Sequence, residues 1–194
     1  MKEKHTNTGK NAVAALIMTL MIVLSIPLGV NRSFARLRED VEHEYYYDST
    51  GYALWEGVNA RREFAQNLIT IAEKYVDEYP ELQTPIDELG FRVLQENSYT
   101  TLEDETFTSI VKINSELTQD AYELYWALEK VPLAEKDKEY PWQIMVDLKS
   151  EQDKLHRSSY NDLAREYNAR LEKFPANVLR HLFGIKLMGV FEKG

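Results

Sequence analysis

The chain has 194 residues, and its 23 Lys and Arg against 32 Asp and Glu give a formal net charge of −9. The first 35 residues carry +3 (four basic minus one acidic), which leaves −12 for residues 36–194. Such an acidic surface argues against nucleic-acid binding, because neutralising phosphates requires a basic face. The absence of cysteine excludes disulfides, thiol nucleophiles and thiolate metal sites.

An uncharged apolar run, Ala12–Val30, follows a short polar N-terminus of residues 1–11. As a helix, the run would be roughly 28 Å long, close to the thickness of a bilayer core. Two membrane interpretations are open: a single-pass anchor, or a signal peptide cleaved after Ala35, where Ser33 and Ala35 are suitably small. The run exceeds the usual signal-peptide core of about 7–15 residues, which favours a transmembrane anchor.

The orientation of this anchor is not given by the basic residues beside it. Three precede the apolar run and three follow it: Lys2, Lys4, Lys10, Arg32, Arg36 and Arg38. The positive-inside rule therefore favours neither orientation. The cleavage-like Ser-Phe-Ala sequence and the long domain behind it favour an extracytoplasmic domain. We expect a single-pass protein of the cell membrane with its domain on that side.

After the apolar run, the sequence has helical periodicity and no hairpin-turn signal. Residues 31–48 are expected to extend the apolar helix into the aqueous phase. Three further long helices are predicted at about 52–79, 102–131 and 141–174, each followed or ended by a proline. Short breaks favour antiparallel neighbours. The predicted fold is therefore all-α: an antiparallel up-and-down bundle of about four long helices, the first continuing from the transmembrane segment.

Smaller features complete the prediction. Thr84 is a possible N-cap for a short helix that precedes the second long one, and Thr100 with Glu103 resembles a capping box. A short amphipathic turn is expected at 178–183. We assign residues 31–185 to the bundle domain and residues 186–194 to a tail.

Two polar residues interrupt the apolar stripes of the predicted helices. Arg61 interrupts the first stripe and Asn114 the second. A buried arginine without a partner would cost several kcal/mol. Both residues could fix helix register by hydrogen bonding, form a polar cluster that binds a ligand, or be exposed if the stripes are out of phase.

A Tyr-Asn pair occurs twice, seven residues apart, at Tyr160-Asn161 and Tyr167-Asn168. Phe174 continues the same helical stripe. Arg61 on a neighbouring helix could donate hydrogen bonds to these groups. The stripe predicts one of two arrangements. It is either an aromatic packing surface held in place by hydrogen bonds of the polar side chains, or a groove that recognises a peptide or a wall polymer.

These residues also carry a resemblance to a known family. The C-terminal signature of the LemA family resembles Tyr160-Asn161, Tyr167-Asn168, Phe174-Pro175, Asn177 and Phe183-Gly184. A second family run is similar to residues 61–75 and is matched at Arg61, Asn67, Leu68 and Tyr75, with Glu63 replacing Asp and Gln66 replacing Pro.

The resemblance covers roughly residues 31–185. It implies a short N-terminus, one membrane segment and a bundle of antiparallel helices, and it implies no known reaction. The Tyr-Asn that the family has just after its membrane segment is missing, and residues 131–143 look like an extended loop. The sequence is therefore similar to a divergent branch of the family.

No constellation of residues indicates catalysis or metal binding. Di-metal sites in helix bundles use inward Glu residues and Glu-x-x-His pairs, whereas this chain offers Asp40-x-x-His43 and Asp153-x-x-His156. It has no Gly-x-Ser-x-Gly motif and no glycine-rich phosphate loop. We expect no enzyme activity, no cofactor and no metal.

The leading functional hypothesis is a non-catalytic, membrane-anchored scaffold or protein-interaction module at the membrane or cell envelope. It would present an acidic, Tyr-rich surface to an unidentified protein partner, and a homo-oligomer is possible. The alternative is a module that binds an envelope polymer fragment or a metal ion in a pocket lined by Arg61, Asn114 and Tyr167.

Overall fold

The computed structural model describes residues 3–47, 51–97 and 106–193, with side chains described for 10–47, 51–95 and 109–193. The described residues form no strand, and their helices are α1 (Glu3–Tyr46), α2 (Leu54–Ala72), η1 (Pro80–Leu82), α3 (Gln83–Asn97), α4 (Thr106–Leu128), α5 (Tyr140–His156), α6 (Ser159–Leu171) and α7 (Ala176–Phe183). An extended stretch, residues 185–193, follows and is called the C-terminal segment below. The predicted all-α class is confirmed.

The first helix, α1, is continuous over 44 residues and passes through Pro27 without ending. Its apolar part is exposed, and in the described chain it is the one helix long and apolar enough to cross a membrane. Burial begins at Val30 and Phe34, and the Phe34 ring lies edge-on to Tyr167 with centroids 5.9 Å apart. Residues beyond the apolar run therefore extend the same helix, as predicted.

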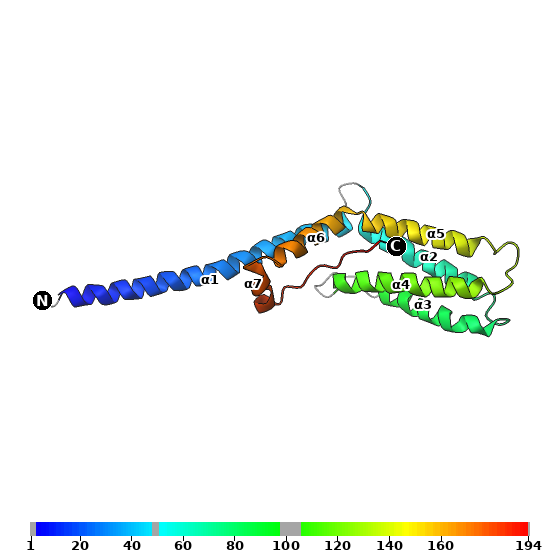
Figure 1. The fold of residues 1–194 in the computed structure, drawn as a ribbon, viewed down its shortest axis with the longest axis horizontal. Coiled ribbons are helices and arrows are strands. Elements are labelled where there is room, and N and C mark those ends of the chain that lie inside the picture. Colours follow the sequence, from blue (N-terminus) through cyan, green and yellow to red (C-terminus); the bar gives the residue numbers. More distant parts are fainter. Residues whose placement is uncertain (1–2, 48–50, 98–105, 194) are drawn as a thin grey trace.

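Helices α2 to α5 form a bundle in which successive helices run in opposite directions (Figure 1). Helix α2 packs on α5, and α3 packs on α4. Their apolar stripes meet in one core, whose most deeply buried members include Leu68, Leu82, Leu89, Leu117 and Leu124. The up-and-down arrangement follows from short connections between long amphipathic helices.

Three predicted helix boundaries differ from the structure. The first long helix ends at Ala72 rather than near Tyr79, because hydrogen-bonded turns replace it. Thr84 lies within α3, which begins at Gln83 directly after η1, so its predicted role as N-cap is wrong. The second long helix ends at Leu128 instead of Val131. The predicted Thr100–Glu103 capping box lies outside the described residues, while the predicted turn at 178–183 is confirmed within α7.

The predicted long helix 141–174 is wrong, because the chain breaks between α5 and α6 at Arg157 and Ser158. Ser158 adopts an extended conformation (φ −68°, ψ 151°). Its hydroxyl donates to the carbonyl of Leu155 at 2.7 Å, a local bond with which serine competes against helix continuation. The break lets α6 leave the bundle and run antiparallel along α1 (Figure 1).

A second core forms where α1, α6 and the C-terminal segment meet. Tyr160 lies at its centre, with its ring edge-on to Tyr45 and to Phe191 at centroid distances of 5.9 Å each. Met188 and Phe191 are buried in the same cluster. The domain boundary predicted at residue 185 is therefore too early, because the supposed tail supplies part of a core.

Candidate functional site

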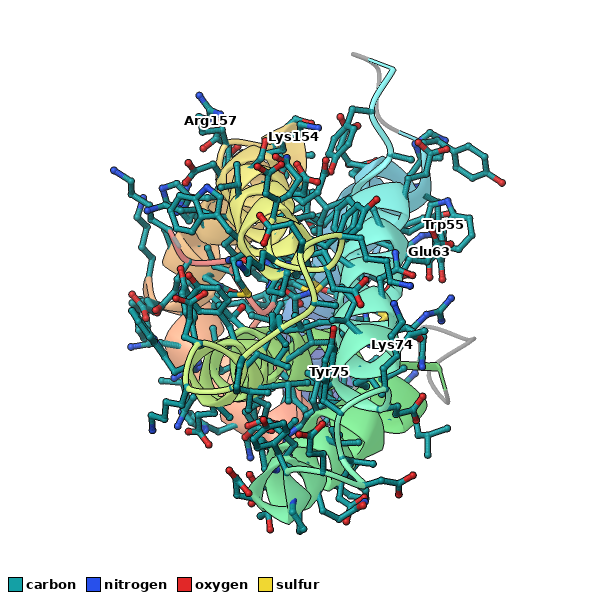
Figure 2. The ribbon with its side chains drawn as sticks, turned by 90° about the vertical axis from the view of Figure 1, so that its right-hand side faces the viewer. Trp55, Glu63, Lys74, Tyr75, Lys154 and Arg157 are labelled. Atoms are coloured by element: carbon teal, nitrogen blue, oxygen red, sulfur yellow. The ribbon has the colours of Figure 1, made fainter. Side chains whose placement is uncertain are left out.

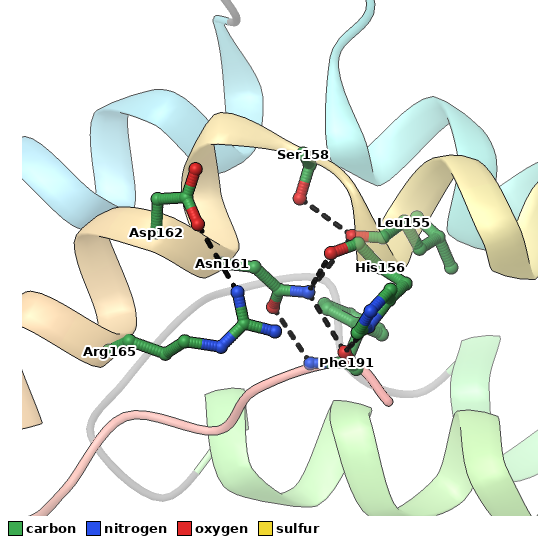
Figure 3. A network of polar contacts seen from close by, with 7 residues as sticks. All are labelled: Leu155, His156, Ser158, Asn161, Asp162, Arg165 and Phe191. Atoms are coloured by element: carbon green, nitrogen blue, oxygen red, sulfur yellow. Dashed lines mark hydrogen bonds and ion pairs between the residues drawn. The ribbon is translucent and has the colours of Figure 1, made fainter. Parts of the chain in front are cut away.

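The side chain of Asn161, near the start of α6, binds the backbone of the C-terminal segment (Figure 3). Its Nδ2 donates to the carbonyl of Phe191 at 2.8 Å, and its Oδ1 accepts from the Phe191 N–H at 2.8 Å. A paired contact of this kind imitates the exchange of bonds between two β-strand residues. Asn161 is wholly buried, so the contact is shielded from water.

The same amide also completes the end of α5. Nδ2 of Asn161 lies 3.2 Å from the carbonyl oxygen of Leu155 and 2.8 Å from that of His156. The last carbonyls of a helix lack partners within the helix. Asn161 therefore supplies partners to carbonyls at the α5–α6 break while it holds Phe191.

Asn168, seven residues further along α6, makes the same kind of paired contact. Its Nδ2 donates to the carbonyl of Met188 and its Oδ1 accepts from the Met188 N–H, both at 2.8 Å. Seven residues of helix rise roughly 10.5 Å, and three residues of extended chain span about 10 Å. The spacing of the Asn pair (Asn161 and Asn168) thus matches Phe191 and Met188, with the two chains antiparallel.

Three further side chains hold the segment. The Tyr160 hydroxyl donates to the carbonyl of Gly189 at 2.9 Å, and Gln152 Nε2 donates to the carbonyl of Glu192 at 2.5 Å. Nδ1 of His156 lies 3.1 Å from the Phe191 carbonyl. Because a carbonyl only accepts, this contact is a hydrogen bond when Nδ1 carries the proton.

Burial raises the pKa values of the tyrosines on this face. Desolvation raises the pKa of Tyr160 far above its ordinary value of 10, with smaller contributions from nearby Tyr45 and Glu42. Desolvation also raises the pKa of Tyr167. An ordinary tyrosine is already neutral at physiological pH, and burial extends this neutral range to higher pH, so the Tyr160 hydroxyl keeps the proton that it donates to Gly189.

A groove of about 710 Å³ lies between α4 and the far edge of the C-terminal segment. The α4 side presents Tyr122 and Trp126, which are 39% and 58% exposed. The opposite side is the chain from Gly189 to Lys193. An aromatic wall facing an extended backbone is suited to receiving another extended chain.

Arg61 and Asn114 meet inside the bundle, and neither residue lines this groove, although Thr118 beside them does. The Arg61 guanidinium donates to the Leu148 carbonyl at 3.1 Å, to the Asn114 carbonyl at 3.3 Å and to the Thr118 hydroxyl. Arg61 and Asn114 are fully buried, so the predicted exposure through mis-phased stripes is wrong. Helices α2, α4 and α5 are joined by these bonds, which agrees with the interpretation that Arg61 fixes helix register.

The partners of Arg61 described above lie on α4 and α5, whereas the Asn pair binds the C-terminal segment. Tyr167 packs on Phe34 of α1. The structure therefore brings Arg61 and Asn114 together, and it places Tyr167 in the second core. The ligand pocket predicted from these three residues is not assembled in this arrangement.

Tyr75 joins the end of α2 to the loop between α4 and α5. Its hydroxyl donates to Asp137 Oδ2 at 2.8 Å and accepts from the Ala134 N–H at 3.0 Å. Lys74 Nζ lies 3.1 Å from the other carboxylate oxygen of Asp137. Figure 2 shows Tyr75 directed inward at this end of the bundle, with Trp55 and Glu63 at the periphery. These hydrogen bonds, chiefly that of Tyr75, lower the pKa of Asp137.

The remaining predicted site residues have weaker roles in the structure. Asn67 is exposed on α2. Phe174 is 83% exposed, and the cis Phe174–Pro175 bond precedes α7. Asn177 has a buried Oδ1 with no hydrogen-bond partner. None of these residues is among those that line the groove.

Sequence reasoning missed the other half of the site: Gln152, His156, Met188 and Phe191. The sequence did contain a signal. Met188 and Phe191 are three residues apart, and three residues of extended chain cover about the same distance as the seven helical residues between Asn161 and Asn168. This match has meaning only once the C-terminal segment is known to lie along α6. Periodicity within one segment carries no such information.

Comparison with known proteins agrees with the architecture. The sequence profile of the LemA family matches residues 55–193, well over half of the chain and including the C-terminal segment. Neither the comparison with curated proteins nor that with solved structures found a match. The match spans the bundle, the Asn pair and the segment that the pair holds, and on this ground the chain belongs to the LemA family.

Proposed function

We propose that this protein is a non-catalytic, membrane-anchored module that holds a protein partner at the membrane, with an extended stretch of that partner in the groove beside the C-terminal segment. The observation that carries the proposal is the groove itself. One wall has exposed Tyr122 and Trp126, and the other is extended backbone that the Asn pair already holds.

Anchoring by residues 12–30 without cleavage is part of the proposal. Phe34 is buried against Tyr167, and α1 runs unbroken past Ala35. Cleavage after Ala35 would remove Phe34 from the second core, and removing a buried Phe side chain costs roughly 3–5 kcal/mol. Retention of the apolar helix is the arrangement that keeps this core filled.

Recognition of an extended chain has a physical basis. An added chain gains main-chain hydrogen bonds from an extended neighbour, and pockets for its side chains give specificity. Aromatic side chains such as Trp126 bury large areas at interfaces. We therefore expect the partner to supply an extended segment with an apolar side chain directed at Tyr122 and Trp126.

Site-specific photocrosslinking of the full-length protein in cells tests this proposal. A photoreactive residue replaces Trp126, and the matched control replaces Trp55 on α2, which is 45% exposed. We expect a discrete adduct from position 126 that position 55 does not give. Equal adducts at both positions, or none at 126, would contradict the proposal. An adduct at twice the chain mass of 22.6 kDa would identify the partner as a second copy.

The same groove supports a second candidate, an oligosaccharide fragment of an envelope polymer, because Tyr and Trp can pack against sugar rings. Titrating the purified protein with such fragments would raise its melting temperature if they bind the folded state. A metal ion is not proposed: within the described ranges, no three His, Cys, Asp or Glu residues lie together as a metal site.

We further propose that the domain lies outside the cytoplasm. Because the chain has no cysteine, a single Cys at exposed Glu63 gives an unambiguous label. Labelling of intact cells by a membrane-impermeant maleimide is the expected result. Labelling only after lysis would mean that the domain is cytoplasmic.

A further inference from the structure

Helix α7 has an apolar face that no part of the described chain covers. Val178 and Leu182 lie four residues apart on this face and are 59% and 72% exposed. Phe174 is also exposed directly before the helix, and Phe183 is 40% exposed at its end. The opposite side is anchored, because Ala176 is buried in the second core. Exposed apolar side chains on one face of a helix, such as Val178 and Leu182, are typical of an interaction surface.

The position of α7 identifies the end of the domain to which this face belongs. α7 contacts α1 and α6. Val30, the last residue of the apolar run, and Phe34 belong to the same packed cluster as Ala176. Between residues 12 and 29 of α1, every side chain is exposed except that of Pro27, which is partly buried. The face on α7 therefore lies at the end of the domain nearest the apolar run.

The direction of α7 is also informative. Figure 1 shows α7 running across the axis of α1 rather than along it. If α1 crosses a bilayer, a helix that runs across it beside the end of the apolar run lies in the plane of the membrane surface. An amphipathic helix in that plane buries its apolar side about 5–10 Å into the headgroup and acyl boundary.

Charge at this end differs from that of the rest of the domain. Between residues 170 and 187 the sequence has four basic residues and one acidic residue, Glu172, whereas the net charge of the whole chain is −9. Arg32 and Arg36 add positive charge on α1. Basic residues within a Debye length of an anionic leaflet are attracted to it. The charge pattern thus fits a lipid surface at this end of the domain.

We propose that α7 is an interfacial helix that inserts Val178, Leu182 and the preceding Phe174 into the surface of the bilayer that α1 spans, with Lys173, Arg180 and Lys186 at the level of the lipid phosphates. This proposal depends on the anchoring proposed above. It gives the domain a second membrane contact, which restricts its tilt about α1. Since the C-terminal segment begins just after α7, the same contact holds the start of that segment near the membrane.

The test uses the full-length protein reconstituted into vesicles of phosphatidylcholine and phosphatidylglycerol. Single cysteines at Leu182, at Leu20 within the apolar run and at Leu94 on α3 carry an environment-sensitive fluorophore. All three residues are exposed in the protein, at 72%, 60% and 68%, so labelling leaves the core intact. Lipids with spin labels at shallow or deep positions quench the fluorophore according to its depth.

We expect a blue shift and strong quenching by shallow spin labels at position 182, quenching by deep labels at position 20, and neither at position 94. If position 20 is quenched but position 182 behaves like position 94, the proposal that α7 is interfacial is wrong, whereas the proposed membrane anchor is supported. If position 20 is not quenched, the proposed membrane anchor is itself wrong. If position 182 is blue-shifted but inaccessible to lipid quenchers, a protein covers α7 and the proposal is overturned.

Discussion

The side-chain amide of Asn161 bonds both backbone polar groups of Phe191, donating to its carbonyl and accepting from its N–H at 2.8 Å each. These residues are 30 positions apart in the chain. Through this contact a buried polar side chain in the second core binds the backbone of the C-terminal segment.

Replacing Asn161 by Ala should lower the free energy of unfolding by about 2 kcal/mol, because the His156 carbonyl and the Phe191 N–H lose a buried partner and the Leu155 and Phe191 carbonyls each lose one of theirs. Thermal unfolding of the full-length protein in detergent, followed by circular dichroism, measures this loss. Asn67→Ala is the control, since Asn67 is exposed on α2, and should change stability by no more than about 0.5 kcal/mol. Equal effects of the two variants would refute the role of Asn161.

Phe191→Ala should release the C-terminal segment from α6. Phe191 is 1% exposed, and truncating a buried Phe costs about 3–5 kcal/mol. We expect the native protein to resist carboxypeptidase and the variant to be shortened under the same conditions. Leu187→Ala, at a position 38% exposed, serves as the control. If the native protein is digested as fast as Phe191→Ala, the segment is not held in solution.

Tyr160→Phe tests the hydroxyl bond to Gly189, whose loss should cost about 1 kcal/mol at neutral pH. Burial raises the pKa of Tyr160 above 10 in the folded state. Above pH 10 the unfolded chain therefore loses a proton that the folded chain keeps, and stability falls as pH rises. Urea unfolding between pH 8 and pH 11 should show a shallower fall for Tyr160→Phe than for the native protein. A parallel decline would mean that Tyr160 is not buried as described.

Asp137→Asn should weaken the contact between the turns just after α2, which carry Lys74 and Tyr75, and the loop between α4 and α5. The folded pKa of Asp137 is lowered, chiefly by the Tyr75 hydrogen bond and then by Lys74. The ionised carboxylate therefore adds stability above its ordinary pKa of 3.8, and that stability is lost as pH falls through the lower folded pKa.

The variant should accordingly be less stable than the native protein at pH 7, and the difference should disappear in acid. Melting temperatures from pH 7 down to pH 2 measure it. Asp162→Asn removes an exposed carboxylate paired with Arg165 and should have little effect throughout. A difference for Asp137→Asn that persists at pH 2 would point to a steric rather than an ionic cause.

Arg61→Met should destabilise the bundle by about 3 kcal/mol or more, because the carbonyls of Leu148 and Asn114 and the Thr118 hydroxyl lose a charged donor in a buried site. Arg61→Lys should restore little, since an ammonium cannot reproduce the planar fork of donors. Arg165→Met, at an exposed ion pair, is the control. If denaturant unfolding gives Arg61→Lys the same free energy of unfolding as the native protein, the planar donor geometry of Arg61 is not what stabilises the bundle.

Much of the fold could be predicted from local patterns. The uncharged run Ala12–Val30, the apolar stripes of the bundle helices and the prolines after them are properties of short windows of sequence. Helical periodicity and helix-ending prolines act over a few turns. The continuous α1, the all-α bundle and its antiparallel order follow from them, as does the recognition of Arg61 and of the Tyr-Asn repeat.

The sequence by itself thus determined which segments become helices, which helix could cross a membrane and which residues form a repeat. Only the tertiary structure decided that the chain breaks at Ser158, that α6 leaves the bundle for α1, and that the Asn pair binds residues 188 and 191. The reason is physical: α6 packs on α1, and the Asn pair binds residues 188 and 191, through contacts between segments that lie far apart along the chain. The bond from Ser158 to Leu155 is local and favours a break, but it does not decide where α6 goes. The side-chain amide of an Asn can form hydrogen bonds with any backbone group that lies near it. Only the fold places the backbone of Phe191, rather than another residue, beside Asn161.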